Sequence, residues 1–261
     1  MQAGAITAQG MQPPPGKLEG AYIFLALLLV TQALEPLLLI GSSGSDDALS
    51  DSNPASLLSA LAIYVVALVI LARRPAQALD TIKSNPLLIA VFALPLISVA
   101  WSVDPGTTFR RAAALVMTGV FCVYIAQRLS PEDFVRRLLL ALFVGGVLSL
   151  LYTIADPRQA IEHSMINTGS WKGVYGHKAI LGRIAAIAVT VSVYVRPRHR
   201  WERPMRWATI AIFLFLSVKS QSRASWLMMM GGFAFMFLIA ILRNKRLSSG
   251  VKLAIALTLG F

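Results

Sequence analysis

The residues with the clearest chemical potential lie in one short stretch, Trp171-Lys172-Gly173-Val174-Tyr175-Gly176-His177-Lys178. Two lysines and a histidine favour an anionic partner, while the two aromatic rings offer flat faces of the kind that stack on sugars. The glycines permit sharp backbone turns and close approach to a ligand. Such a loop cannot face lipid at membrane depth, so we expect it at a water boundary or lining a polar cavity. The candidate binding residues are Trp171, Lys172, Tyr175, His177 and Lys178; a plain loop at a membrane interface is the alternative.

Two arginines extend this candidate site. Arg183 lies five residues into the apolar segment that follows the loop, where a buried arginine is costly and marks function, unless it is a snorkelling or paired structural charge. Arg223 follows Ser220-Gln221-Ser222. Its guanidinium can grip a diphosphate with two parallel hydrogen bonds, which a lysine cannot do. We expect the small serines beside it to let a bulky head group approach.

Several kinds of chemistry are excluded by the sequence. It holds no Walker-type loop, dinucleotide fingerprint, His-Glu-x-x-His motif or nucleophile elbow. Its one cysteine, Cys122, rules out an internal disulfide or a cysteine-based metal site. The sequence therefore predicts no metal and no cofactor. The net charge of +12 does not indicate nucleic acid, because the basic residues fall in short clusters between apolar runs.

These residues must be positioned by membrane helices. The chain has 261 residues, of which 56% are hydrophobic and 14% charged, and its mean hydropathy is +0.68. The apolar residues come in long runs, which predicts an all-α, polytopic membrane helix bundle with about eight complete spans and the start of a ninth. The predicted spans are Ala21–Gly41, Ala55–Ala72, Leu87–Trp101, Ala112–Ala126, Leu138–Ala155, Ala179–Val195, Trp207–Val218 and Ser225–Leu242, with a ninth from Val251. Residues 1–20 are expected to be a disordered cytoplasmic tail without a cleavable signal peptide, and residues 21–261 a membrane domain.

The loops between these segments sort by charge, which predicts orientation. Basic residues gather after the second, fourth, sixth and eighth segments, whereas the loop after the first segment has Asp46, Asp47 and Asp51 and no basic residue. The positive-inside rule then places the N-terminus in the cytoplasm. It places residues 171–178 and the turn 219–223 together on the extracytoplasmic face. Topology and contact with anionic lipid are the expected roles of the cytoplasmic clusters.

Three stretches, taken in order, resemble the O-antigen ligase and polymerase superfamily, and are closest to its ExoQ-type exopolysaccharide production proteins. The loop 171–178 with Leu181-Gly182 is similar to the family pattern W-x-G-x-x-x-H-K-N-x-x-G, with Ala179 in place of the asparagine. Residues 98–105 with Arg110-Arg111 resemble S-x-x-W-S-x-D-P…R-R, and residues 220–225 resemble S-x-S-R-[ST/A]. The motifs fall within roughly residues 100–261.

The resemblance implies a metal-independent, inverting glycosyltransferase in the bacterial inner membrane. It would polymerise undecaprenyl-diphosphate-linked oligosaccharide on the periplasmic face, with Arg223 as the diphosphate clamp and the loop residues and Arg183 as secondary contacts. The family's general base lies in a large loop after the ninth span. That loop is absent from these 261 residues, so we expect them to be part of a longer protein.

The expected partners are a lipid-linked glycan donor, a glycan acceptor and membrane lipids, with polysaccharide export or chain-length proteins as further candidates. A ligase acting on lipid A core or on a protein hydroxyl fits the same motifs as a polymerase. A transporter or flippase for a lipid-linked sugar is the rival of another class, and a purely structural membrane subunit is a third reading. A transporter would need deep charges in several spans and an internal repeat, neither of which is evident.

Overall fold

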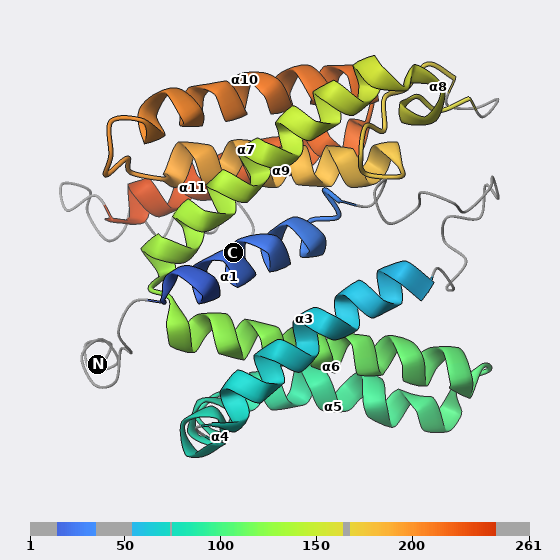
Figure 1. The fold of residues 1–261 in the computed structure, drawn as a ribbon, viewed down its shortest axis with the longest axis vertical. Coiled ribbons are helices and arrows are strands. Elements are labelled where there is room, and N and C mark those ends of the chain that lie inside the picture. Colours follow the sequence, from blue (N-terminus) through green and yellow to red (C-terminus); the bar gives the residue numbers. More distant parts are fainter. Residues whose placement is uncertain (1–14, 35–53, 74, 164–167, 244–261) are drawn as a thin grey trace. The chain divides into compact units, whose positions relative to one another are not determined.

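The computed structural model describes residues 15–34, 54–73, 75–163 and 168–243, and in this part of the chain the structure is all-α, without strands (Figure 1). The predicted ninth span, most of the N-terminal tail and the end of the first predicted span lie outside the described residues. The chain divides into two compact units, and the division falls inside α7 (Pro131–Ala155), whose residues up to Leu138 belong to the first unit.

The first unit contains the helices that precede the candidate site. These are α1 (Lys17–Val30), α3 (Pro54–Ala72), α4 (Pro75–Lys83), α5 (Pro86–Ser98), the short 3-10 helix η1 (Val99–Trp101) and α6 (Pro105–Arg128). Most of them begin with proline, whose fixed φ suits the first helical position, where its missing N–H is not needed. Helices α5 and α6 pack closely, because a Cβ on Gly119 of α6 would stand 2.0 Å from the Phe92 ring.

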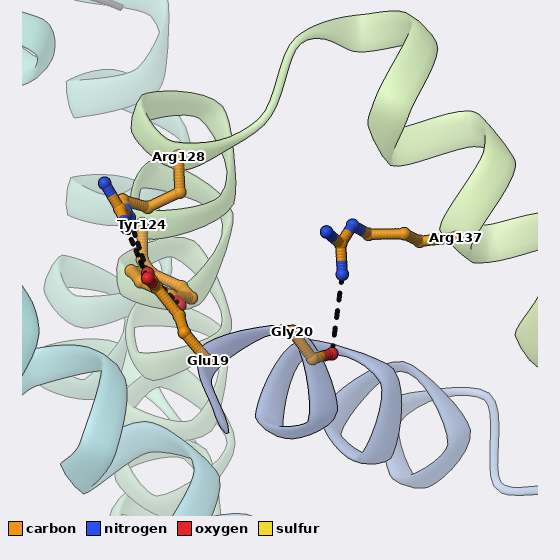
Figure 2. Close-up of polar contacts among 5 residues, drawn as sticks. All are labelled: Glu19, Gly20, Tyr124, Arg128 and Arg137. Atoms are coloured by element: carbon orange, nitrogen blue, oxygen red, sulfur yellow. Dashed lines mark hydrogen bonds and ion pairs between the residues drawn. The ribbon is translucent and has the colours of Figure 1, made fainter. Parts of the chain in front are cut away.

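An ion-pair cluster fastens the start of α1 to α6 within this unit (Figure 2). The guanidinium of Arg128 donates to both carboxylate oxygens of Glu19, and the Tyr124 hydroxyl donates to Glu19 Oε1 at 3.0 Å. Arg137 reaches the carbonyl of Gly20 at 3.5 Å. The hydrogen bonds from Arg128 hold the pKa of the Glu19 carboxyl below its ordinary value of 4.5.

The second unit carries the candidate site. It holds the rest of α7, the one-turn helix α8 (Pro157–Ala160), α9 (Lys178–Tyr194), α10 (Glu202–Ser220) and α11 (Arg223–Arg243). Helix α9 packs along both α10 and α11 (Figure 1). Glycine permits close approach of α7 and α10, since a Cβ on Gly146 would stand 2.9 Å from the Phe213 ring. Helices α9, α10 and α11 therefore pack as a group, to which α7 adds through Gly146.

Each predicted apolar segment within the described residues is helical, and most helices extend beyond the apolar run into its polar flanks. Helices α6 and α7 are long and apolar enough to cross a membrane. Shorter apolar helical stretches occupy 58–72, 86–101 and 223–239. The sequence did not predict α4, which lies in a stretch read as a basic loop, and the single cysteine, Cys122, is exposed.

Candidate functional site

The loop before α9 folds back on α8 as an irregular hairpin. Ile161 and Trp171 form an isolated antiparallel bridge, and the Glu162 N–H donates to the Ser170 carbonyl at 2.8 Å. The N–H groups of Lys172 and Gly173 both donate to the Ala160 carbonyl, at 2.9 and 3.0 Å. Backbone hydrogen bonds therefore hold Trp171 and Lys172 in place.

Glycine is required in this loop for a left-handed backbone at three positions and, at one of them, also for close packing. Gly169, Gly173 and Gly176 all have left-handed backbone, with φ of +85°, +57° and +60°. Gly173 also lies directly against α7, where an added Cβ would stand 1.9 Å from the Ser149 hydroxyl, whereas Gly169 faces open space. The loop therefore needs glycine at 173 for both conformation and close approach.

Trp171 joins the loop to the end of α10. Its backbone N–H donates to the Lys219 carbonyl at 3.1 Å. Its ring meets Phe215 edge-on, with centroids 5.6 Å apart and an interplanar angle of 84°. The Lys219 ammonium lies 5.7 Å from the centroid of Trp171 and 5.8 Å from that of Phe215, within cation–π range of both rings. Trp171 and Lys219 thus tie together two segments that lie about fifty residues apart in sequence.

The turn between α10 and α11 meets the start of α9 at Gly182. A Cβ there would stand 2.7 Å from Ser222 Oγ, 2.9 Å from Ser222 Cβ and 3.0 Å from Ser225 Cβ. Gln221, with φ of +51°, ends α10 in a left-handed turn. The loop 168–178 and the turn 219–225 therefore form one continuous surface, which we call the loop–turn site.

The serines of this turn are buried, contrary to the expectation that they leave room for a head group. Ser220 and Ser225 are 0% exposed and Ser222 is 6% exposed. Ser217 and Ser225 share a hydrogen bond of 2.9 Å, and the Ser225 hydroxyl also contacts the Ser222 carbonyl at 2.7 Å. Their small size allows α9, α10 and α11 to pack together. Because these serines are buried, they do not form the exposed surface of the site.

Both candidate arginines are exposed and lie beside this contact. Arg183 follows Gly182 and Arg223 follows Ser222, so each is one residue from the point where the two segments touch. Among the described residues, neither guanidinium has a hydrogen-bond or ion-pair partner. Arg183 was predicted to be a buried charge; instead it lies on the exposed face of α9, as does Ile187 one turn later. Their donors are available to an anion.

His177 and Lys178 start α9 and are held by Glu162. The ring nitrogen Nδ1 of His177 accepts the Ala179 N–H at 3.1 Å and caps the helix. Its Nε2 faces Glu162 Oε1 at 3.6 Å, and the same oxygen accepts the Lys178 N–H at 3.0 Å. Glu162 is only 8% exposed. Both nitrogens of His177 are thus directed at the protein, although its side chain is 53% exposed.

Glu162 was not singled out from the sequence, because its partners lie 15 and 16 residues away across an irregular loop. Its carboxylate sits at the N-terminus of α9, where a negative charge is favoured by the helix dipole. It acts as the anchor of the loop: its backbone holds Gly169 and Ser170, and its side chain holds the start of α9.

Tyr175 lies inside the protein and offers no ring face to the surface. It is 0% exposed, and its hydroxyl would stand 2.7 Å from a Cβ on Gly145 of α7. Burial raises the pKa of this phenol. Its hydroxyl and those of Ser149 and Ser170 have no hydrogen-bond partner among the described residues. The buried side chain of Tyr175 therefore packs the loop against α7.

The residues 98–111, which carry another part of the family resemblance, lie in the first unit. Asp104 caps α6: its carboxylate accepts the Thr107 N–H at 3.1 Å and the Thr107 hydroxyl at 2.6 Å. The same bonds lower the pKa of Asp104. Trp101, Arg110 and Arg111 are exposed. Within the described ranges, no group of three His, Cys, Asp or Glu side chains is arranged to hold a metal ion.

Comparison with known proteins adds no identification: no family model, curated protein or solved structure matches the chain.

Proposed function

We propose that the chain crosses the membrane several times and presents the loop–turn site on the extracytoplasmic face. Beyond α6 and α7, helix α10 supports this placement. It has 19 residues, a length of about 28 Å, close to the ~30 Å hydrocarbon core. Its charged residues lie in its first five positions and at Lys219, and the uncharged stretch 207–218 between them carries exposed apolar side chains such as Phe215 and Val218.

The two ends of α10 differ in charge, which supports the orientation. Five arginines lie between positions 196 and 206, at or near its first turn, whereas the other end carries Lys219 beside Trp171 and, in the turn that follows, Arg223. The positive-inside rule assigns the arginine-rich end to the cytoplasm. The loop–turn site then faces the periplasm of a bacterial inner membrane.

We further propose that this site binds the diphosphate of an undecaprenyl-diphosphate-linked oligosaccharide for glycan transfer. The observation that carries this proposal is the contact of Gly182 with Ser222, together with the hydrogen bond from Trp171 to Lys219. These contacts join the two segments that resemble separate glycan-polymerase motifs. They bring Arg183 and Arg223, whose guanidinium groups have no partner among the described residues, beside one surface.

The geometry suits a transfer reaction at a diphosphate-linked sugar. In that reaction the acceptor hydroxyl attacks the anomeric carbon, the bond to the diphosphate oxygen breaks, and negative charge grows on the leaving diphosphate. Fixed cations at that position stabilise the transition state more than the ground state. We assign Arg223 as the main clamp and Arg183, Lys172 and Lys178 as secondary contacts. The indole of Trp171 is only partly exposed and borders the site.

His177 has a positioning role in this proposal. Because Nδ1 is engaged as an acceptor and Nε2 is directed at Glu162, the neutral ring keeps no free lone pair for an acceptor hydroxyl. None of the described residues is assigned as the general base.

Replacing Arg223 by lysine tests the proposal in cells that make the polymer. We expect short or absent polymer, because lysine keeps the charge and loses the two-pronged geometry. Arg158→Lys, on the exposed surface of α8, is the matched control and should leave polymer length unchanged. Normal polymer from Arg223→Lys and Arg223→Ala at wild-type protein levels would contradict the assignment. If labelled sugar from the lipid-linked donor appeared on lipid A core instead of on a longer polymer, the protein would be identified as a ligase.

A further inference from the structure

The connection between α9 and α10 carries an unusually dense group of cations that the glycan chemistry does not use. Its arginines are Arg196, Arg198, Arg200, Arg203 and Arg206. All but Arg206 are exposed. Only one acidic residue, Glu202, occurs in the sequence after Glu162. Within residues 163–261, Glu202 is therefore the one carboxylate available to offset this charge.

The single carboxylate is turned inward and holds the backbone. Glu202 is 5% exposed and accepts the Arg198 N–H at 2.6 Å. Arg206 is also used internally: it donates to the Val195 carbonyl at 3.2 Å, and its guanidinium lies 5.1 Å from the centroid of the Trp207 ring. These contacts fix the bend between the helices. Arg200 and Arg203 have no such partner among the described residues and point outward.

Two exposed tryptophans accompany these outer arginines: Trp201 lies between them in sequence and Trp207 follows them. Trp201 is 55% exposed and Trp207 is 62% exposed, and His199 stacks on Trp201 with planes 6° apart. Arg203 and Trp207 are four residues apart on the exposed face of α10, which continues toward Leu214 and Phe215. Along this face a cation is followed by an indole and then by aliphatic and aromatic side chains, the order of a headgroup, an interface and acyl chains.

We propose that residues 196–207 form a binding site for anionic phospholipid, with Arg200 and Arg203 on the headgroup phosphate and Trp201 and Trp207 at the glycerol level. This inference rests on the membrane placement proposed above and is independent of the glycan reaction. An anion that carries acyl chains is favoured over a water-soluble anion because the arginines adjoin an exposed apolar face. The planar guanidinium suits a phosphate with two oxygens free.

The test is binding of phosphatidylglycerol to the purified full chain, measured by native mass spectrometry and by protection against thermal unfolding. We expect phosphatidylglycerol to bind and protect, and phosphatidylcholine and free inorganic phosphate at equal concentration to have little effect. The double variant Arg200→Gln, Arg203→Gln should weaken phosphatidylglycerol binding at least about tenfold, since each cation near an anionic surface contributes severalfold to affinity.

A matched pair, Arg110→Gln, Arg111→Gln, removes the same charge at a different place. If both double variants weakened phosphatidylglycerol binding equally, the effect would come from net charge alone and the proposal would be overturned. Full protection against unfolding by inorganic phosphate would also overturn it. Undiminished binding to the Arg200, Arg203 variant would overturn it as well. The Arg223→Gln variant separates the two sites, because it should impair polymer formation and leave phosphatidylglycerol binding intact.

Discussion

Substituting Gly182 by alanine tests how the loop–turn site is assembled. The new Cβ would stand 2.7 and 2.9 Å from two atoms of Ser222 and 3.0 Å from Ser225. Both serines are short and buried, so they have little freedom to withdraw. Helix α9 must therefore move away from the turn that carries Arg223, and Arg183 moves with it.

The magnitude follows from comparison with a second glycine. Extra methyl groups in a well-packed interior cost about 1–3 kcal/mol, while alanine gains up to about 1 kcal/mol over glycine in a helix. Gly231 of α11 faces open space, with no atom within 4 Å of an added Cβ. Gly231→Ala should therefore show only the gain in stability that alanine gives over glycine in a helix. The difference in unfolding free energy between the two variants isolates the clash, at about 1–3 kcal/mol.

Thermal unfolding and binding of a polyprenyl diphosphate provide the assay. We expect Gly182→Ala to be less stable than Gly231→Ala and to bind the diphosphate more weakly, whereas Gly231→Ala binds like the wild type. Adding Ser222→Gly removes the two nearest atoms and should recover most of both losses, a coupling that a double-mutant cycle measures. Equal stability of the two alanine variants, or no recovery with Ser222→Gly, would refute the packing at this contact.

Three further predictions concern the loop and the first helix. Gly173→Ala should destabilise more than Gly169→Ala, because both strain a left-handed backbone and only the former also clashes with α7; thermal unfolding compares them. Glu162→Ala should speed proteolysis of the loop by leaving the Lys178 N–H without its acceptor, while Glu162→Gln retains that acceptor and changes cleavage less. Because its folded-state pKa is lowered, Glu19 stabilises the protein above pH 4.5 and loses this effect as pH falls through the lower value. The melting temperature of the wild type should therefore fall more in acid than that of Glu19→Gln, and parallel acid curves would contradict this.

The helices were predictable because their determinants are local. Apolar runs can be read within a few residues, and the helices that they predict are confirmed where the structure describes them. The prolines at first helical positions and the Asp104 cap are equally local features. Helix α4 was missed because its sequence, PAQALDTIK, is amphipathic and short rather than continuously apolar.

The candidate site was predictable only in part, since its contacts are long-range. Charge patterning indicated that the loop and the turn share one face, and the Trp171–Lys219 contact joins them. The burial of Tyr175 and the exposure of Arg183 depend on which faces of α7 and α9 meet their neighbours, which spacing alone does not decide. The role of Glu162 depends on a backbone N–H sixteen residues away.

Binding of undecaprenyl diphosphate, the proposed leaving product, tests the central claim most directly. The account predicts saturable binding to the purified wild-type chain and at least about tenfold weaker binding to Arg223→Lys, because two parallel guanidinium hydrogen bonds are lost. The Arg200→Gln, Arg203→Gln variant should bind it like the wild type. Equal affinity of the wild type and Arg223→Lys, or no binding to the wild type, would contradict a diphosphate site at the loop–turn surface.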